Sequence, residues 1–324
     1  MKIVIDDQIP ELANLLTAYA EITSLPSIEI THPHIQNADA LFVRTVTKIT
    51  RDLIHDTRIK FIASASAGID HVDLAYLQRQ QIHYCYAPGC NALAVMNYLM
   101  STIATLGFDI VDKKIGVIGI GRIGKLVSET LKKLGAQVFQ KFRPDDLFSA
   151  IPNDCDLITL HPSLTFNHHP SYHLIEAKFL AALKPGAILI NASRGAVINE
   201  AALTRDDLLY CLDVFEHEPQ INVDLFHRAA IATPHIAGYS LAAKYRASLM
   251  LFDAFCDWQN LPKMTIERAE LENKVAQNQM HLKLDTNWQE KILEIYDPRN
   301  DKFDPAKFTQ ARKNYVLRKE IVFF

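Results

Sequence analysis

The sequence predicts an α/β protein with two doubly wound parallel sheets, followed by a small C-terminal module. Three observations predict this fold class. Short apolar runs recur through the first three quarters of the chain, helical patterns separate several of them, and the last of the 11 glycines is Gly238. A chain of 324 residues is long enough for two domains with buried cores.

Strands are expected at short runs rich in apolar and β-branched residues. Most runs are continuous rather than alternating, as in strands buried on both faces of a parallel sheet. In chain order the runs are KIVID (2–6), ALFVR (40–44), FIASA (61–65), IHYCYA (82–87), IGVIGI (115–120), AQVFQ (136–140), DLITLH (156–161), GAILINA (186–192) and LLYCLDV (208–214).

Helical patterns between these runs predict right-handed βαβ units. The clearest are GKLVSETLKKLG (124–135) and EAKFLAALKPG (176–186). One sheet is expected before about residue 92 and another from about residue 113. A long apolar helix at 91–107 would join them, and a second at 240–258 would cross back to the first sheet.

The tail has a different composition. It lacks glycine, and 22 of its final 62 residues are charged. Interleaved with the charges are the apolar residues Trp288, Ile292, Ile295, Tyr296, Phe303, Phe308, Tyr315 and Val316. A small module with these side chains would gain stability by pairing across a two-fold axis. We therefore expect residues 263–324 to form a dimerisation module and the protein to be a homodimer.

Charge and cysteine content exclude several classes of protein. A net charge of −3 gives no basic footprint for nucleic acid or an anionic membrane. No apolar run approaches the roughly 18 residues that cross a bilayer, and Asp6 and Asp7 interrupt any signal-peptide core. The cysteines show no CxxC spacing, so we expect reduced thiols and no metal site; they are Cys85, Cys90, Cys155, Cys211 and Cys256. A cytoplasmic globular protein with neither a nucleic-acid nor a membrane partner is expected.

The strongest local signal is a glycine-rich loop between a predicted strand and a predicted helix. Gly119, Gly121 and Gly124 stand in G-x-G-x-x-G spacing. The first glycine permits a tight turn, the second lets a pyrophosphate approach the backbone, and the third allows helix and strand to pack closely. Free N–H groups at the helix start would bind the anion. The loop therefore predicts a dinucleotide cofactor, although an ordinary glycine-rich turn has the same pattern.

The expected acid for the adenine ribose is missing. An Asp or Glu normally lies about 20 residues beyond the glycines, but Phe142 and Arg143 stand there. Asp145 and Asp146 follow slightly late and keep NAD the first choice. Because an Arg near this point accommodates a 2′-phosphate in related sites, NADP stays open as a second choice.

Three later segments supply groups suited to hydride transfer. They are NASRGAVIN (191–199), LDVFEHEP (212–219) and TPHIAGY (233–239). Oxidation of a 2-hydroxy acid needs a base, a partner that orients it, and a fork for the carboxylate. His235, Glu218 and Arg194 would fill these roles. Taken singly, each residue also has an interpretation without a catalytic role: His235 as a loop histidine, Glu218 as a solvated turn residue and Arg194 as part of a surface ion pair.

In this order, after a dinucleotide loop, the segments resemble the D-isomer-specific 2-hydroxy-acid dehydrogenases. The resemblance covers nearly the whole chain, and LKPGAILINASRGAVINE and LDVFEHEP carry it most specifically. Five further segments narrow the resemblance to a branch of the family whose substrate is a phosphorylated 2-hydroxy acid. They are FVRTVTKIT (42–50), SASAGIDHVD (64–73), APGCNALAV (87–95), PHIAGYS (234–240) and RKNYVLRKE (312–320). The resemblance implies a Rossmann cofactor domain at 95–241, inserted in a flavodoxin-like substrate domain at 1–94 and 242–262.

The resemblance also implies roles for individual residues. Arg194 would hold the carboxylate, His235 would take the hydroxyl proton, and Glu218 rather than Glu216 would orient His235. Further cofactor contacts would come from Arg122, Ile123, Phe142, Pro162, Ala192, Ser193, Asp213 and Gly238, beside the loop glycines. Substrate contacts would come from Thr45, Ser66, Tyr239, Arg44 and Lys48, the last two for the phosphate. Arg312, Lys313 and Arg318 would add cations if a partner subunit's tail reached over.

Two other functions stay open at this point. One is a related 2-hydroxy-acid dehydrogenase or 2-oxo-acid reductase acting on glycerate or 3-phosphoglycerate. The other is a non-catalytic dinucleotide-sensing protein that resembles a corepressor. A complete Arg–Glu–His set argues against a pure sensor, because a sensor has no use for a general base.

Overall fold

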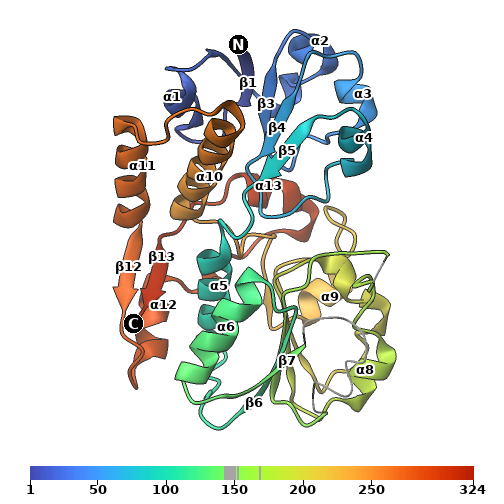
Figure 1. Ribbon diagram of the computed structural model, residues 1–324. Coiled ribbons are helices and arrows are strands. Elements are labelled where there is room, and N and C mark those ends of the chain that lie inside the picture. The colour runs from blue at the N-terminus through green and yellow to red at the C-terminus, as the bar shows by residue number, and fades with distance from the viewer. Residues whose placement is uncertain (142–150, 152, 168) are drawn as a thin grey trace. The chain divides into compact units, whose positions relative to one another are not determined.

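The structure is a computed structural model that describes residues 1–141, 151, 153–167 and 169–324 (Figure 1). Contacts divide these residues into two compact units. Unit 1 comprises Met1–Asn91 and Ser240–Gln279, and unit 2 comprises Ala92–Tyr239 and Met280–Phe324. The chain therefore leaves unit 1, builds most of unit 2, returns to unit 1 and ends in unit 2.

Unit 1 contains a five-stranded sheet in the order β2-β1-β3-β4-β5, in which each pairing is parallel. This is the strand order of flavodoxin-like folds. Its strands are β1 (Lys2–Asp6), β2 (Glu21–Leu25), β3 (Ala40–Val43), β4 (Phe61–Ser64) and β5 (His83–Tyr86). Its helices are α1 (Leu12–Leu16), α2 (His32–Ile35), α3 (Arg51–Ile54), α4 (Leu74–Arg79), α10 (Leu241–Gln259) and α11 (Ile266–Gln277).

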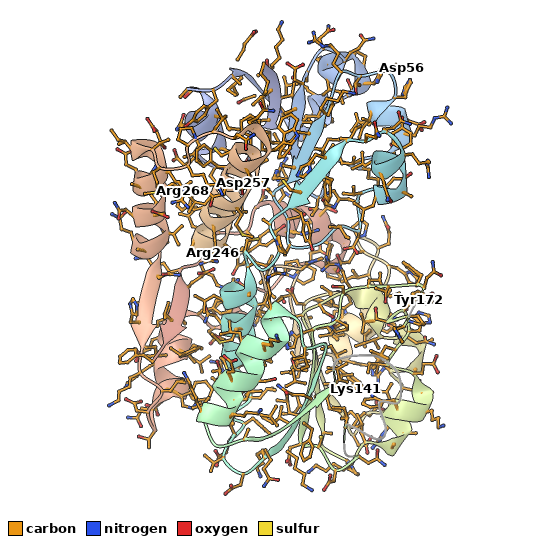
Figure 2. All side chains as sticks on the ribbon, viewed as in Figure 1. Asp56, Lys141, Tyr172, Arg246, Asp257 and Arg268 are labelled. Carbon is orange, nitrogen blue, oxygen red and sulfur yellow. The ribbon has the colours of Figure 1, made fainter. Side chains whose placement is uncertain are left out.

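Helices cover both faces of this sheet. Ile3 and Ile5 of β1 belong to an apolar cluster with α1 and α10, whereas Val4 between them faces the cluster formed with α2, α3 and α4. Continuous apolar strands are required for this arrangement because both faces are buried. Helix α11 lies beside α10, where Arg268 (Figure 2) pairs with Asp253 at 3.0 Å between Nε and Oδ1.

Unit 2 contains a six-stranded parallel sheet in the order β11-β10-β9-β8-β6-β7. Its strands are β6 (Lys114–Ile118), β7 (Gln137–Lys141), β8 (Leu157–Leu160), β9 (Ile188–Asn191), β10 (Leu209–Leu212) and β11 (Ile231–Ala232). The helices before the tail are α5 (Ala92–Thr105), α6 (Arg122–Lys133), α8 (Ala177–Ala182) and α9 (Val223–Arg228). The strand order reverses between β6 and β8, and open α/β sheets bind ligands at the carboxyl ends of strands at such a point.

The tail does not form a separate body in this structure. Helix α11 belongs to unit 1, whereas α12 (Trp288–Ile295), α13 (Phe308–Lys313) and the small β12–β13 sheet (Gln279–Leu282 and Glu320–Phe323) lie almost wholly in unit 2. Trp288 and Ile292 are buried against α5, and Phe308 is buried against Phe215. These side chains, expected at a subunit interface, complete a core within their own chain. Val316 differs, with 85% of its surface exposed.

The nine predicted strands and four predicted helices are all present, with boundaries shifted by a few residues. Four described strands were not predicted: β12 and β13 in the tail, and the edge strands β2 and β11 of the two parallel sheets. β2 is mostly exposed and lacks a continuous apolar run, and β11 has two residues. Within the described part of the chain, no helix combines the length and apolar character needed to span a membrane.

Candidate active site

The glycine loop follows β6 and opens α6, as predicted. Gly119 has a φ of +88°, and a Cβ there would lie 2.4 Å from the backbone nitrogen of Pro162. A Cβ on Gly124 would lie 2.1 Å from the Gly119 carbonyl oxygen, whereas one on Gly121 would meet no described atom within 4 Å. Two of the glycines therefore permit close backbone packing, and the third leaves open space beside the helix start.

This open space fits the pyrophosphate of a dinucleotide. Helix α6 has 12 residues, and its first N–H groups lack intrahelical partners. Arg122 is exposed in the first turn and Ile123 is half-buried beneath it. The Gly119 N–H donates to the carbonyl of Lys141 (Figure 2) at 2.8 Å, so the end of β7 adjoins the loop. Phe142 and the acids after it lie outside the described residues.

Arg194 lies on a loop that follows β9 and is fixed by a buried amide. Asn191 is fully buried; its Nδ2 donates to the Arg194 carbonyl at 2.9 Å, and its Oδ1 accepts from the backbone and hydroxyl of Ser193. Ala192 and Ser193 are half-buried on this loop. A Cβ on Gly195 would lie 1.9 Å from the backbone of Phe215. The Arg194 loop and the segment that carries Glu218 are therefore in direct backbone contact.

Glu218 and His235 form a hydrogen-bonded pair. Glu218 Oε2 lies 2.7 Å from His235 Nδ1, and Glu218 Oε1 accepts from the Phe215 N–H at 2.9 Å. Burial alone would raise the pKa of the Glu218 carboxyl, but the hydrogen bond and charge of His235, with a smaller contribution from Arg312, lower that pKa. The carboxylate is therefore ionised at neutral pH, and His235 keeps Nε2 for another partner.

Glu216 has different partners. Its Oε1 lies 2.5 Å from His173 Nε2, and its Oε2 accepts from the Glu200 N–H at 3.3 Å. Its own N–H donates to the Glu200 side chain at 2.6 Å. The structure thus brings Glu218, not Glu216, to His235.

Asp213 is 1% exposed and holds the loop that contains His235. Its Oδ1 accepts from the Ile236 N–H and the Thr233 hydroxyl, both at 2.7 Å, and its Oδ2 accepts from the Ala237 N–H at 2.9 Å. Burial raises the pKa of this carboxyl. Asp213 was expected to contact the cofactor. The hydrogen-bond partners described for its carboxylate lie in the histidine loop, which also contains the half-buried Gly238.

The predicted phosphate ligands are in unit 1. Arg44 Nε donates to the buried Asp6 at 2.9 Å, and its Nη2 donates to Ser27 Oγ at 2.7 Å. Lys48 and Thr45 are exposed. Lys244, on α10 in the same unit, was not predicted; burial and the positive charge of Arg44 lower its pKa. No signal in the sequence marks it, because α10 also contains the charged residues Arg246, Asp253 and Asp257.

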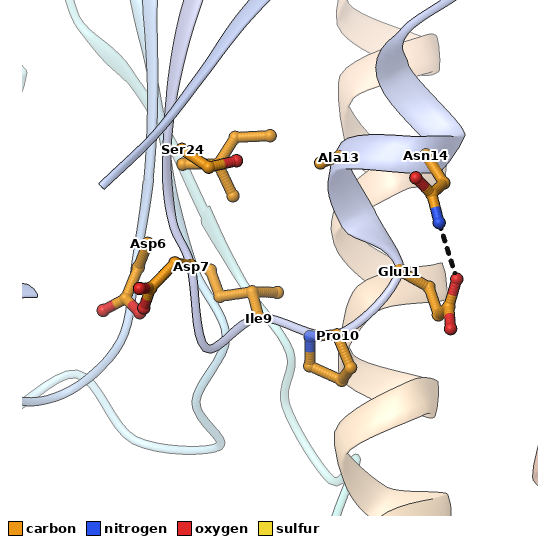
Figure 3. Close-up of a pocket in the computed structure, with 9 residues that line it drawn as sticks. Asp6, Asp7, Ile9, Pro10, Glu11, Ala13, Asn14 and Ser24 are labelled. Carbon is orange, nitrogen blue, oxygen red and sulfur yellow. Dashed lines mark hydrogen bonds between the residues drawn. The ribbon is translucent and has the colours of Figure 1, made fainter. Parts of the chain in front are cut away.

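Asp6 also lines a surface pocket at the end of β1, with Asp7, Glu11 and Ser24 (Figure 3). Glu11 accepts a hydrogen bond from Asn14 there at 2.9 Å. An acidic lining does not suit a phosphate, so the anion site is better sought on the guanidinium side of the Asp6–Arg44 pair.

Ser66 is buried, and its hydroxyl proton is already used. Its Oγ donates to the Gly68 carbonyl at 2.7 Å and lies 2.9 Å from Ser64 Oγ. It therefore offers a substrate an acceptor rather than a donor in this conformation.

The tail reaches the site within the same chain. Arg312 Nε donates to the Tyr239 hydroxyl at 2.9 Å and its guanidinium lies over the Tyr239 ring. Arg318, expected as a further cation for the phosphate, instead donates to backbone carbonyls of the histidine loop. Lys313 is exposed. The sequence could not place these contacts, because more than 70 residues separate the partners.

The chain is similar to known proteins over nearly its whole length. Residues 95–237 match the family model described as D-isomer specific 2-hydroxyacid dehydrogenase, NAD binding domain. A protein of Coxiella burnetii (strain RSA 331), named erythronate-4-phosphate dehydrogenase, is 36% identical over 99% of this chain and 93% of its own. A protein of the same name from Bacteroides fragilis (strain YCH46) is 36% identical over 99% of this chain and 97% of its own.

A solved structure of NAD⁺-bound 3-phosphoglycerate dehydrogenase from Entamoeba histolytica shares the fold. It covers 80% of this chain and 95% of its own, with a TM-score of 0.68 and 24% identity. The full-length relatives, together with the family model, establish that this chain belongs to the D-isomer specific 2-hydroxyacid dehydrogenase family and is an NAD-dependent oxidoreductase.

Proposed function

We propose that this enzyme oxidises 4-phospho-D-erythronate to 3-hydroxy-2-oxo-4-phosphooxybutanoate with NAD, a step of vitamin B6 coenzyme synthesis. The Glu218–His235 pair, in which Glu218 lies on a segment in backbone contact with the Arg194 loop, carries this proposal. The names of the full-length relatives support the choice of substrate.

In this proposal each side chain of the site has a separate task. Because Glu218 occupies His235 Nδ1, the base that takes the C2 hydroxyl proton is Nε2. The ionised Glu218 fixes the ring and stabilises the imidazolium that forms. The Arg194 guanidinium holds the C1 carboxylate, a bidentate task that its planar fork suits. The glycine loop, with Gly119, Gly121 and Gly124, would hold NAD, which would supply the acceptor for the hydride from C2.

For the substrate phosphate we propose Arg44 and Lys48, joined by Lys244. Lys244 supports this assignment because burial and, second, the positive charge of Arg44 lower its pKa, so a further anion beside both side chains would offset that shift. Lys48 carries an exposed ammonium on the segment that follows Arg44. Thr45, Ser66 and Tyr239 are proposed for the rest of the substrate.

A substrate profile tests the function. We expect NAD reduction with 4-phospho-D-erythronate and a kcat/KM for D-erythronate lower by about 10²-fold or more, since each hydrogen bond to a charged group contributes about 1.5–3 kcal/mol. D-glycerate and 3-phosphoglycerate complete the panel. Preference for 3-phosphoglycerate would replace the proposed substrate. Tight NADH binding without turnover of any of the four would favour the dinucleotide sensor.

Glu216 and Glu218 allow a matched test of which carboxylate orients His235. Glu218→Gln should lower kcat, because a neutral amide cannot stabilise the imidazolium that forms when His235 takes the proton. Glu216→Gln should leave kcat nearly unchanged, since its contacts are with His173 and Glu200. Steady-state kinetics of both variants measure the two effects, and the reverse pattern would assign the role to Glu216.

We also propose that the enzyme is a cytoplasmic homodimer. Five free cysteines, four of them buried, support a reducing compartment. Exposed apolar side chains in the tail region, Met264 and Ile266 in unit 1 and Val316 in unit 2, support an association surface. Sedimentation velocity of the full chain measures the oligomeric state.

A further inference from the structure

The backbone groups of Ile236 and Ala237, the two residues that follow His235, are bound by a carboxylate and by a guanidinium. As described above, Asp213 accepts the N–H groups of Ile236 and Ala237. Arg318 donates to the carbonyl groups of the same two residues, from Nη1 to Ile236 at 2.9 Å and from Nη2 to Ala237. Donors and acceptors of both residues are thus fixed by one carboxylate and one guanidinium.

Arg318 is itself held firmly. Its guanidinium lies 4.4 Å from the centre of the Tyr296 ring, Nη1 lies 3.0 Å from the Tyr315 hydroxyl, and Nη2 donates to the Ala94 carbonyl at 3.2 Å. Its Nε is buried. A planar guanidinium can bridge two carbonyls and stack on an aromatic ring at once, which an ammonium cannot do.

The backbone of His235 needs such support. Its φ is +58°, in the left-handed region that costs non-glycine residues energy unless the surrounding structure holds them there. The His235 N–H donates to the Asp213 carbonyl at 2.7 Å, which fixes the preceding side of the residue. On the C-terminal side of His235, the backbone is held by the bonds of Asp213 and Arg318 to residues 236 and 237.

We propose that Arg318 is a positioning residue for the catalytic base. Through the carbonyls of residues 236 and 237 it keeps His235 in the orientation that directs Nε2 to the substrate, and it thereby makes the tail part of the catalytic machinery. The inference rests on the proposed role of His235 as base.

The test compares Arg318→Lys with Asn97→Ala. Lysine retains the charge but cannot span both carbonyls. Asn97 anchors the same tail at a buried point, where its amide donates to and accepts from the Ile321 backbone, both at 2.8 Å, without a described contact to residues 235–239. Asn97→Ala therefore loosens the tail and serves as the control for general destabilisation. Arg318→Met is a second variant, without the charge.

Three measurements are made on each full-length variant: kcat and KM with whichever 2-hydroxy acid the wild type oxidises, NADH affinity, and amide exchange of residues 233–240. For Arg318→Lys we expect kcat to fall about 10–100-fold, as for a misplaced catalytic group, with KM and NADH affinity changed less than about threefold. Amide exchange of residues 236 and 237 should accelerate. Asn97→Ala should lower Tm but keep kcat within about twofold of wild type.

The proposal is overturned if Arg318→Lys keeps kcat within about threefold of wild type, or if Asn97→Ala loses as much kcat at a comparable Tm. Unchanged amide exchange at 236 and 237 in both Arg318 variants also overturns it. If the wild type oxidises no 2-hydroxy acid, the proposed function is rejected instead. The comparison of amide exchange between wild type and variants still tests whether Arg318 restrains residues 236 and 237.

Discussion

Replacement of His235 by alanine is expected to lower kcat by about 10²–10⁴-fold, the usual contribution of a general base, while NADH binding changes little. Nδ1 of His235 is taken by Glu218 at 2.7 Å, so Nε2 is the atom that can accept a proton. The glycine loop, which would bind the dinucleotide, lies on β6 and α6 and is not altered by the substitution. Steady-state kinetics and NADH fluorescence titration measure the two effects.

His173 provides a closely matched control. Its side chain is 24% exposed and bonded to Glu216, whereas that of His235 is 25% exposed and bonded to Glu218. His173→Ala therefore removes the same kind of pair at a similar burial and should leave kcat within about threefold of wild type. A His235→Ala enzyme that kept more than half of the wild-type kcat would refute the assignment of the base.

Gly195→Ala is expected to have the second large effect. A Cβ at this position would lie 1.9 Å from the Phe215 carbonyl group and 2.4 Å from the Glu216 nitrogen. Because these atoms are backbone, the Arg194 loop must move away from the segment with Glu218. A displacement of about 1 Å in a catalytic group can cost about 10²-fold in rate, so kcat/KM should fall by at least this factor.

Gly107→Ala separates this effect from loss of stability. Gly107 ends the α5 region with a φ of +60° and meets no described atom within 4 Å of an added Cβ, so its substitution strains the backbone without a clash. It should lower Tm and leave kcat/KM nearly unchanged. If Gly195→Ala lowered Tm no more than Gly107→Ala and retained kcat/KM, the two loops would not need their close contact.

The sequence was sufficient for elements whose signals are local. Continuous apolar strands, the glycine loop and the order of Arg194, Glu218 and His235 were all predicted from short segments, and the structure has the strands and the loop where expected. The edge strand β2 was missed because its sequence, EITSL, has only two apolar residues and most of its residues are exposed.

The rest of the site depends on contacts between distant segments. Asn191 and Asp213 look like ordinary polar residues at strand ends, yet each organises a loop through bonds to backbone groups. Arg318 lies 81 residues from Ala237 in sequence, and no local pattern distinguishes its buried, stacked guanidinium from a solvated surface charge. Only the folded structure shows which charged side chains bond to other groups of the protein and which remain available to bind the substrate.

The return of the chain to unit 2 has a consequence for its synthesis. Residues 1–279 supply all of unit 1, but unit 2 still lacks Trp288, Ile292 and Ile321 from its core at that stage. Although most of unit 2 precedes α10 in the chain, unit 2 is the unit that is completed last. A ribosome-bound chain that stops before Arg318 is therefore expected to have a folded unit 1 and an inactive histidine loop, so that activity begins only when the tail has emerged.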